Sequence, residues 1–317
     1  MPKACEKSGF ELSKPVIVIV GPTASGKTDV AQEIARRVQG EVVSADSMQI
    51  YEGMDIGTGK LAEGERVVPH WGFDIRKPGE AYSASLFQEY ARSCFVDIDA
   101  RGKRCVLAGG TGFYVRAAID DYDFASGEQV DNPVREKWSA FLAEHGVQAL
   151  WDELSNRDAQ SAAIIHPNNS KRVLRALEML ELDGVSYAAQ HAGLSTLGQA
   201  VPALFFGLSV DPDLLKRRID ARVDRMFADG LVGEVRGLCE RGFADALTAR
   251  EAIGYKEVVA ALEGRCTMEE ASEQIKLATR RYAKRQRSWW RHDERVRWIA
   301  ADDGNVARMA DEIESML

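Results

Sequence analysis

The sequence predicts an α/β protein in which helices flank a parallel β-sheet. Val16–Val20 reads VIVIV, and such short, uniformly β-branched runs are typical of strands buried on both faces of a parallel sheet. A helix-compatible stretch, residues 28–38, follows directly. Two further apolar segments, residues 41–45 and 104–108, end in turns that contain Asp46 or two glycines. Alternating strands and helices favour a doubly wound sheet, whose ligands bind at the carboxyl ends of the strands.

The rest of the chain predicts a helical insertion and a return to the sheet. Residues 120–200 show helical periodicity, with favourable helix starts at Asn132-Pro133 and Asn168-Asn169-Ser170. Residues 201–210 again have the pattern of a strand, and residues 211–317 read as mostly helix. We therefore expect a catalytic core formed by residues 1–119 and 201–317, and a helical insertion domain formed by residues 120–200.

Length and composition are those of a soluble globular protein. The chain has 317 residues, of which 45% are hydrophobic and 28% charged, which allows two domains or one domain with an insertion. It has no run of about 18 apolar residues that could span a membrane. The apolar run at residues 16–20 is too short for a signal peptide, so we expect a cytoplasmic protein. The five cysteines include no C-x-x-C pair, which favours neither a zinc site nor a disulfide framework.

Charge is distributed unevenly along the chain. The net charge is −8, yet residues 276–297 contain nine Lys or Arg against two acidic residues, a local charge of +7. The aromatic residues among these basic residues are Tyr282, Trp289, Trp290 and Trp298. This mixture suits base stacking beside phosphate contacts in RNA. The alternative is a solvated helix face, in which Trp289 and Trp298 anchor the helix in the core.

The most specific motif is GPTASGKT at residues 21–28, which fits the G-x-x-x-x-G-K-[ST] phosphate-loop (P-loop) pattern between a strand and a helix. Backbone N–H groups and the helix N-terminus would face an anion, Lys27 would add a positive charge, and Thr28 could ligate Mg²⁺. This loop occurs in nucleotide-binding and ATP-binding proteins. By itself it predicts a bound di- or triphosphate and does not specify ATP. The predicted diphosphate-binding residues are Gly21, Thr23, Ala24, Ser25, Gly26, Lys27 and Thr28.

Two further turns at strand ends contain reactive groups. Asp46 could coordinate Mg²⁺, act as a general base or cap the following turn, and spacing alone leaves these three roles open. GGTGFY at residues 109–114 offers the hydroxyl of Thr111 after a glycine turn. Arg218 and Arg222 are four residues apart on a predicted helix, so they share a face and could both bind one phosphate oxygen. The alternative is a solvated face on which they form ion pairs with Asp220 and Asp224.

Together these motifs resemble those of the tRNA dimethylallyltransferases, which isopentenylate an adenosine next to the anticodon of tRNA. The resemblance covers nearly the whole chain in family order and is most specific at GPTASGKT, ADSMQIYEGMDIGTGK and TRRYAKRQRSWWR. The matching segments are residues 21–28, 45–60, 67–75, 81–88, 109–114, 166–178, 230–235, 252–257 and 279–291.

The resemblance implies a role for each reactive group. Asp46 would be the general base that accepts a proton from the adenine N6 amine. Lys27, Thr28 and Mg²⁺ would hold the diphosphate of dimethylallyl diphosphate. Thr111 and one arginine of the pair Arg218 and Arg222 would stabilise the departing oxygen. Transfer to N6 of adenosine 37 would release diphosphate, and no ATP turnover is expected.

The resemblance also implies an anticodon stem-loop as partner, with the target base flipped into a channel. The family pattern and the basic segment together predict these tRNA contacts: Asp46, Ser47, Met48, Gln49, Arg135, Lys171, Arg172, Val173, Leu174, Arg175, Arg280, Lys284, Arg285 and Gln286. The eukaryotic zinc-finger extension does not follow Trp298, so the bacterial type is the closer match. By default we expect a monomer. Gly59, where alanine is usual, and Gly112-Phe113 after Thr111 depart from the family pattern.

Three other functions share some of these features. An adenylate isopentenyltransferase acting on free AMP, ADP or ATP would need the P-loop, Asp46 and Thr111, but neither the insertion nor the basic aromatic segment. A P-loop kinase is favoured by the loop alone. An RNA-binding module that senses a nucleotide would not require Asp46 and Thr111 at neighbouring strand ends.

Overall fold

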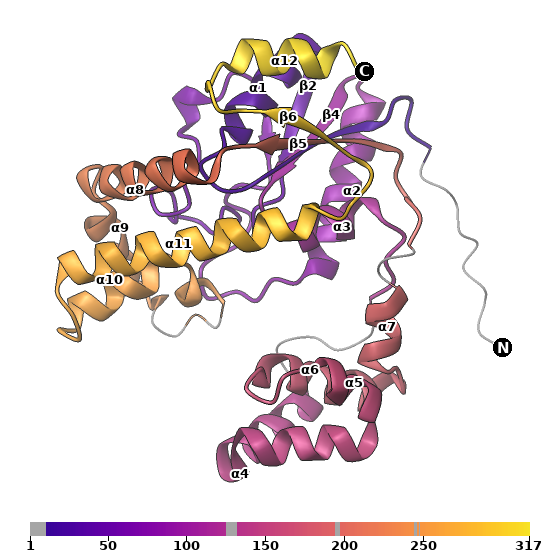
Figure 1. Ribbon diagram of the computed structural model, residues 1–317, viewed down its shortest axis with the longest axis vertical. Helices are drawn as coiled ribbons and strands as arrows, with labels where there is room; N and C mark the ends of the chain where they lie inside the picture. Colours follow the sequence, from indigo (N-terminus) through magenta and orange to yellow (C-terminus); the bar gives the residue numbers. More distant parts are fainter. Residues whose placement is uncertain (1–10, 125–131, 194–196, 244–245, 247) are drawn as a thin grey trace. The chain divides into compact units, whose positions relative to one another are not determined.

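The computed structural model describes residues 11–124, 132–193, 197–243, 246 and 248–317. The described residues form a six-stranded, all-parallel sheet in the order β3-β2-β4-β1-β5-β6. Figure 1 labels β2, β4, β5 and β6 of this sheet. The predicted fold class is confirmed. The strands are β1 (Val16–Val20), β2 (Gly40–Ser44), β3 (His70–Trp71), β4 (Arg104–Gly109), β5 (Ala203–Ser209) and β6 (Val296–Ala300).

The run VIVIV is apolar throughout because β1 is buried on both faces. Val16, Val18 and Val20 enter one hydrophobic core, whereas Ile17 and Ile19 enter a second core on the opposite face. This alternation follows the period of two along a strand. All five side chains are fully buried.

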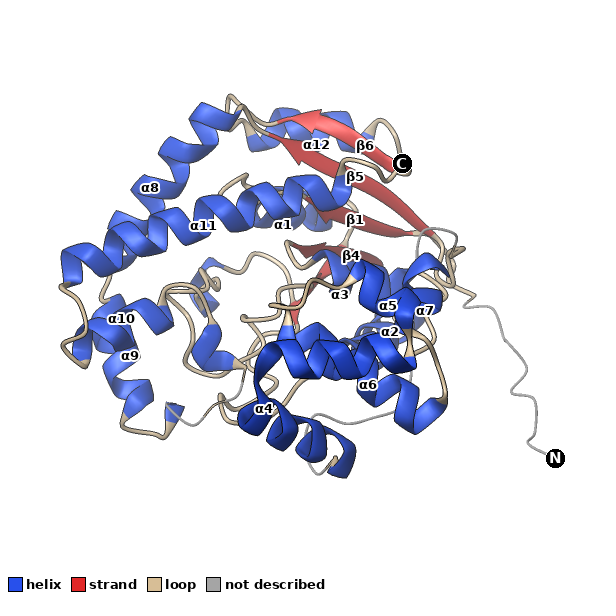
Figure 2. Cartoon of the chain, turned by 60° about the horizontal axis from the view of Figure 1, so that its bottom comes forward, coloured by secondary structure: helices blue, strands red, loops and turns tan. Residues whose placement is uncertain are grey.

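Helices cover both faces of the sheet (Figure 2). In one core, α1 (Lys27–Arg37) and α12 (Val306–Glu314) contribute Ile34 and Ile313. In the other core, α2 (Ala84–Ala100), α3 (Gly112–Ile119) and α11 (Met268–Trp290) contribute Phe87, Val115 and Trp290. The remaining helices of this part are α8 (Pro212–Ala228), α9 (Leu231–Cys239) and α10 (Tyr255–Leu262), with short 3₁₀ turns η1 (Glu63–Glu65) and η3 (Ala249–Glu251). Packing joins α11 to α8 and α10.

Two features differ from the sequence-based expectation. The part expected to be mostly helix contains the edge strand β6, which extends the sheet beside β5. Trp298 lies in this strand and Trp289 on α11, and both are more than two-fifths exposed, so neither anchors the helix in the core. That role belongs to Trp290, whose ring is fully buried near Phe205.

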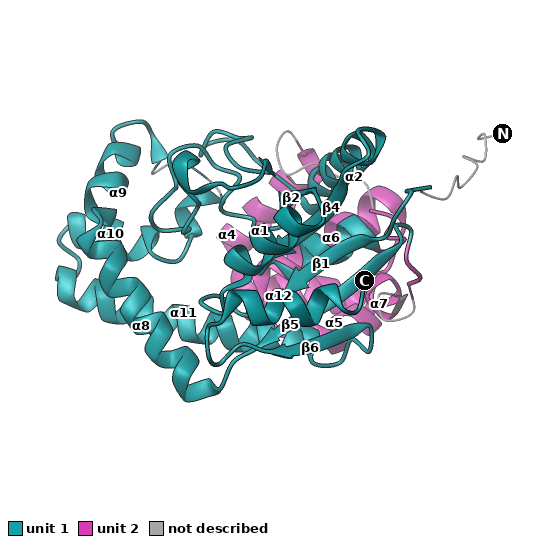
Figure 3. Cartoon of the chain, turned by 90° about the horizontal axis from the view of Figure 1, so that it is seen from above, with its two compact units in different colours: residues 1–119, 200–317 teal, residues 120–199 magenta. Residues whose placement is uncertain are grey.

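The chain divides into two compact units, residues 1–119 with 200–317 and residues 120–199 (Figure 3). The expected insertion, residues 120–200, differs from the second unit by one residue. This unit contains α4 (Pro133–Arg157), α5 (Ala159–Ile164), α6 (Ser170–Asp183) and α7 (Tyr187–Gly193). Asn132 and Asn169 cap α4 and α6 as expected, and the unit has its own core, which includes Trp138 and Leu177. No described helix in either unit is long and apolar enough to cross a membrane.

Candidate functional site

The carboxyl ends of β1, β2 and β4 bring the three predicted turns together. Backbone N–H of Thr111 donates to the carbonyl oxygen of Ala45 at 3.2 Å, and the Ser47 N–H donates to Thr111 Oγ1 at 3.1 Å. A Cβ on Gly109 would lie 2.2 Å from the Ala45 carbonyl oxygen, so only glycine permits this close approach. The Met48 N–H donates to Asp46 Oδ1 at 2.9 Å. Asp46 therefore does stabilise its own turn, one of the three roles left open by its spacing.

The P-loop joins β1 to α1 and contains several hydrogen-bond donors that could bind an anion. Gly26 adopts a left-handed conformation with φ of 89° directly before α1 begins at Lys27. Among the described residues no hydrogen-bond partner is found for the buried hydroxyl of Ser25. Lys27 Nζ donates to the Pro22 carbonyl oxygen at 2.6 Å, which folds the side chain back over the loop. The arrangement suits an anion held by backbone N–H groups, the Ser25 hydroxyl and Lys27.

Two cations share this part of the site. Burial, followed by the charge of Arg222, lowers the pKa of Lys27 to about 7, and the charge of Asp46 opposes this shift. Burial also lowers the pKa of Arg222, again opposed by Asp46. Burial and mutual repulsion disfavour the charged forms of Lys27 and Arg222. A bound polyanion would stabilise both charges, so this position is electrostatically suited to a diphosphate.

The two arginines of the predicted pair have different surroundings. Arg222 Nη1 donates to Thr23 Oγ1 at 3.4 Å and its Nη2 donates to the Thr58 carbonyl oxygen at 3.2 Å. Arg218 instead donates to the carbonyl oxygens of Ala301 at 3.0 Å and Asp302 at 2.7 Å. The geometry places Arg222 against the P-loop, whereas Arg218 is tied to the segment after β6.

Arg222 borders several cavities, and three of these are also lined by P-loop residues. The P-loop cavity, about 440 Å³, is lined by residues 24–29 and by Arg218 and Arg222. The inner cavity, about 80 Å³, lies beside Lys27 and Thr28 and extends to Phe73. The α11 cavity, about 460 Å³, is lined by residues of α8, α10 and α11. The inner and α11 cavities share five lining residues: Thr23, Asp46, Thr58, Arg222 and Tyr282.

Gln286 joins the P-loop to the Thr111 turn and was predicted to contact tRNA. Its Oε1 accepts from the Thr23 N–H at 2.8 Å, and its Nε2 donates to the Gly110 carbonyl oxygen at 2.9 Å. The residue is only 5% exposed. Both ends of the amide are used within the protein, so the structure argues against a direct tRNA contact by this side chain.

Tyr282 is a site residue to which the sequence reasoning assigned only an aromatic surface. Burial and the nearby charge of Asp46 raise its pKa to about 12, against hydrogen bonds with Thr111 and Gln286. Its phenol therefore stays protonated at neutral pH beside Asp46. The sequence signal was the four-residue spacing of Tyr282 and Gln286, which puts both on one face of α11.

The other predicted tRNA contacts of this unit differ in their exposure and in their partners. Lys284 and Arg285 are exposed, and the Arg285 guanidinium lies 5.6 Å from the centre of the Tyr282 ring at the α11 cavity. Arg280 forms an ion pair with Asp220 of α8 at 2.5 Å, whereas the ion-pair face expected from the sequence pairs this aspartate with Arg218 or Arg222. Ser47 and Met48 line the α11 cavity, whereas the buried Gln49 accepts from Ser44 Oγ at 2.8 Å.

The predicted contacts in the insertion also differ among themselves. Lys171 and Arg172 are exposed on α6. Arg135 and Arg175 both pair with the fully buried carboxylate of Glu178. Val173 is fully buried in the core of the insertion and Leu174 packs against that core, so neither side chain is placed for a polar tRNA contact.

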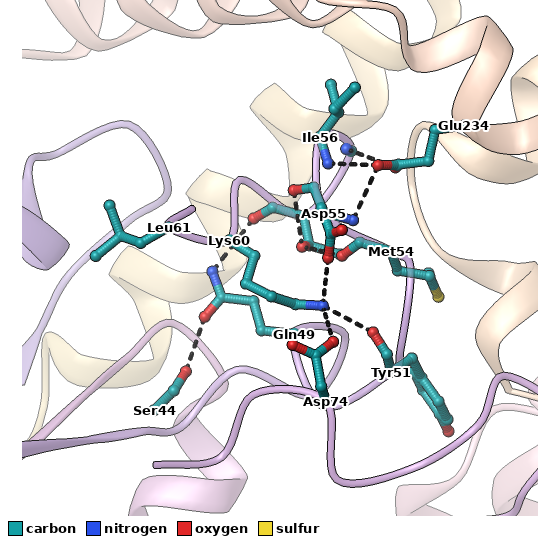
Figure 4. A network of polar contacts seen from close by, with 12 residues as sticks. Ser44, Gln49, Tyr51, Met54, Asp55, Ile56, Lys60, Leu61, Asp74 and Glu234 are labelled. Atoms are coloured by element: carbon teal, nitrogen blue, oxygen red, sulfur yellow. Dashed lines mark hydrogen bonds and ion pairs between the residues drawn. The ribbon is translucent and has the colours of Figure 1, made fainter. Parts of the chain in front are cut away.

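The loop of residues 54–60 forms one wall of the site through a polar network that the sequence reasoning missed (Figure 4). Lys60 Nζ donates to the Tyr51 carbonyl oxygen at 2.8 Å and to Asp55 and Asp74 at 2.6 Å each. Glu234 of α9 approaches the same loop and accepts from three of its N–H groups. Gly59 in this loop and Gly112 at the start of α3 are positions where the chain departs from the family pattern. A Cβ would lie 2.1 Å from Arg222 Nη2 at Gly59 and 2.3 Å from Trp289 Cδ1 at Gly112.

The fold and the site define a P-loop protein whose loop is suited to a polyanion and lies near the carboxylate of Asp46. The α11 cavity, which Asp46 also lines, is bordered by Lys256, Arg281 and Arg285.

Comparison with known proteins gives the family. The chain belongs to the IPP transferase family, which its residues 49–293 match, and residues 14–67 also match isopentenyl transferase. It is 44% identical to a tRNA dimethylallyltransferase of Geobacillus thermodenitrificans and 45% identical to one of Kineococcus radiotolerans, covering 92% of each chain in both cases.

Solved structures agree with this assignment. A full-length tRNA isopentenylpyrophosphate transferase from Bacillus halodurans is 39% identical with a TM-score of 0.68, over 96% of both chains. A eukaryotic dimethylallyltransferase described as acting on tRNA is 27% identical with a TM-score of 0.80, over 95% of this chain and 78% of the other.

Proposed function

We propose that this protein transfers the dimethylallyl group of dimethylallyl diphosphate to N6 of the adenosine next to the anticodon, position 37, in tRNA. The names of the relatives support the reaction class and the tRNA substrate. The observation that supports the proposal most strongly is the junction of the inner and α11 cavities at Asp46 and Arg222. A diphosphate in the P-loop would place its allylic carbon there, facing an acceptor from the α11 side.

In this proposal the P-loop holds the leaving group. The N–H groups of residues 24–28, the Ser25 hydroxyl, Lys27 and Arg222 would bind the diphosphate oxygens. As the bond from the allylic carbon to oxygen breaks, negative charge grows on the diphosphate, and donors already aimed at that position lower the barrier. An aromatic amine is a weak nucleophile, so stabilising the leaving group is the larger part of catalysis.

Asp46 would take the proton released by the acceptor. The bond from N6 to the allylic carbon forms as the carbon–oxygen bond breaks, and the amine then loses a proton to the carboxylate. The Met48 N–H fixes one carboxylate oxygen, which orients the group at the cavity junction. Thr111, 3.1 Å from the Ser47 N–H, would hold the turn and donate to the departing oxygen.

Mg²⁺ fits the same site as a companion of the diphosphate. The described residues contain no cluster of three or more His, Cys, Asp or Glu side chains placed to hold a metal. Mg²⁺ commonly binds phosphate oxygens and water with few protein ligands, so the Thr28 hydroxyl at the P-loop cavity is a suitable ligand. The ion would neutralise charge on the diphosphate.

The tRNA would approach the α11 cavity, whose border is basic. Lys256, Arg281 and Arg285 line this cavity, and Lys284 is exposed one residue before Arg285. Arginines beside the ring of Tyr282 suit a flipped base with its flanking phosphates. Of the insertion residues predicted to contact tRNA, Lys171 and Arg172 are exposed and could add phosphate contacts.

A transfer assay separates this proposal from an enzyme of free nucleotides. Purified protein, Mg²⁺ and labelled dimethylallyl diphosphate are incubated with unmodified tRNA, or with AMP, ADP or ATP. We expect label in tRNA, at an N6-modified adenosine after nuclease digestion. Label in the free nucleotides but not in tRNA would refute the proposal, and label in neither would refute prenyl transfer to adenine.

A further inference from the structure

Glu234 fills a concave site formed by three consecutive backbone N–H groups of the loop 54–60. Its Oε2 accepts from the N–H groups of Asp55 at 3.0 Å and Ile56 at 2.8 Å, and its Oε1 accepts from Gly57 at 3.2 Å. The Tyr255 hydroxyl donates to Oε1 at 2.6 Å (Figure 4 shows the carboxylate facing the loop). Four donors converge on one carboxylate, an arrangement that holds the loop by charge-assisted hydrogen bonds.

Lys60 holds the other end of this loop. Its side chain is only 2% exposed, and its ammonium donates to Asp55, Asp74 and the Tyr51 carbonyl oxygen. Asp55 is thus bound through its N–H by Glu234 and through its carboxylate by Lys60. The loop is fixed from two sides by opposite charges.

The fixed loop presents its carbonyl oxygens to the site. The Thr58 carbonyl oxygen accepts from Arg222 Nη2 at 3.2 Å and lies 3.4 Å from Gln49 Nε2. The Arg222 guanidinium also donates to Thr23 Oγ1 at 3.4 Å. Gly59 leaves no room for a Cβ beside this guanidinium. The direction of Arg222 therefore depends on where the loop puts Thr58.

We infer that Glu234 is a positioning residue for Arg222: by binding the N–H groups of residues 55–57, it sets the Thr58 carbonyl oxygen that aims the guanidinium at the P-loop. The inference rests on the proposed function only in assigning Arg222 a role in catalysis; the hydrogen bonds of Glu234 and Arg222 are independent of it. Glu234 lies on α9, and its hydrogen bonds go to the loop N–H groups and to Tyr255, which are not among the described residues that line the P-loop cavity. Its effect is indirect.

A double-mutant cycle tests this dependence. Glu234→Gln keeps the size of the side chain but replaces one acceptor oxygen with an NH₂ group, which opposes two of the four donors. We expect kcat/KM for dimethylallyl diphosphate to fall about 10- to 100-fold, since small displacements of a positioned group have effects of this size. In an Arg222→Ala background the same substitution should cost less than about threefold, because coupled residues are not additive. Equal losses in both backgrounds would overturn the inference.

Binding of inorganic diphosphate provides a readout that does not depend on turnover. Glu234→Gln should weaken this binding in the otherwise wild-type protein and leave it unchanged when Arg222 is alanine. The matched control is Glu240→Gln, an exposed glutamate just after α9, which should leave binding and rate unchanged. If wild type binds diphosphate but transfers no prenyl group, the proposed function fails while the coupling is still measured.

A milder variant covers the case in which Glu234→Gln does not fold. Tyr255→Phe removes one donor to Glu234 Oε1 and keeps the ring that packs against Gly57. We expect a smaller loss of diphosphate affinity, about two- to fivefold, that again vanishes without Arg222. A loss that persists without Arg222 would contradict the inference.

Discussion

Replacing Gln286 with leucine tests whether this residue holds the site together or binds tRNA. Leucine is similar in size but removes the acceptor for the Thr23 N–H at 2.8 Å and the donor to the Gly110 carbonyl oxygen at 2.9 Å. Each backbone group left without a partner inside the protein costs about 1–3 kcal/mol. The two losses together predict a decrease of about 2–6 kcal/mol in the free energy of unfolding. The same change should raise KM for dimethylallyl diphosphate, because Thr23 belongs to the P-loop.

Urea denaturation measures the first effect, and tRNA affinity measured below the unfolding transition tests the alternative. Gln274→Leu, an exposed glutamine on the same helix, is the matched control and should change unfolding free energy by less than about 0.5 kcal/mol. The reasoning is refuted if Gln286→Leu keeps wild-type stability while tRNA binding weakens several-fold. That outcome would restore the direct tRNA contact expected from the sequence.

Three further changes have defined outcomes. Diphosphate binding favours the charged form of Lys27, whose pKa is about 7, so diphosphate affinity should fall as pH rises above 7. At pH 8 binding should therefore be accompanied by uptake of a proton. Calorimetry in two buffers of different ionisation enthalpy should show this uptake in wild type but not in Lys27→Arg. Arg285→Ala should weaken tRNA binding and reduce the slope of log affinity against log salt by about one, with diphosphate binding unchanged; an unchanged slope would remove Arg285 from the interface. Arg135→Met should lower the free energy of unfolding by about 1–3 kcal/mol, since Glu178 is fully buried and loses one of its two arginine partners; unchanged stability with weaker tRNA binding would favour the contact role instead.

The sheet was predictable because its signals are local. The run at β1 and the glycine turns after β1 and β4 specify buried strands with ligand-binding ends, and the structure has them within a residue or so of the expected bounds. β6 was missed because the five residues Val296–Ala300 follow a dense basic segment in which alternating polar residues hide the strand period. The two-residue strand β3 is too short for any periodic signal.

The sequence predicted only those site residues that belong to a local motif. Lys27, Asp46 and Thr111 lie in local motifs that follow strands, and the sheet brings them together, although spacing alone left the role of Asp46 open. The choice between Arg218 and Arg222 depends on which partner each guanidinium meets, and these partners, Asp302 and Thr58, are distant in sequence. Gln286 and Glu234 act through backbone groups more than 170 residues away, so no local pattern could have assigned their contacts.

The most direct test of the account is the single-turnover rate of Asp46→Asn at saturating donor and tRNA, measured together with its tRNA dissociation constant. Asparagine keeps the acceptor oxygen that binds the Met48 N–H but cannot take a proton. The account predicts a rate at least about 100-fold lower with tRNA affinity within about twofold of wild type. A dissociation constant that rises by as much as the rate falls, or a rate that does not change, would contradict a general-base role for Asp46.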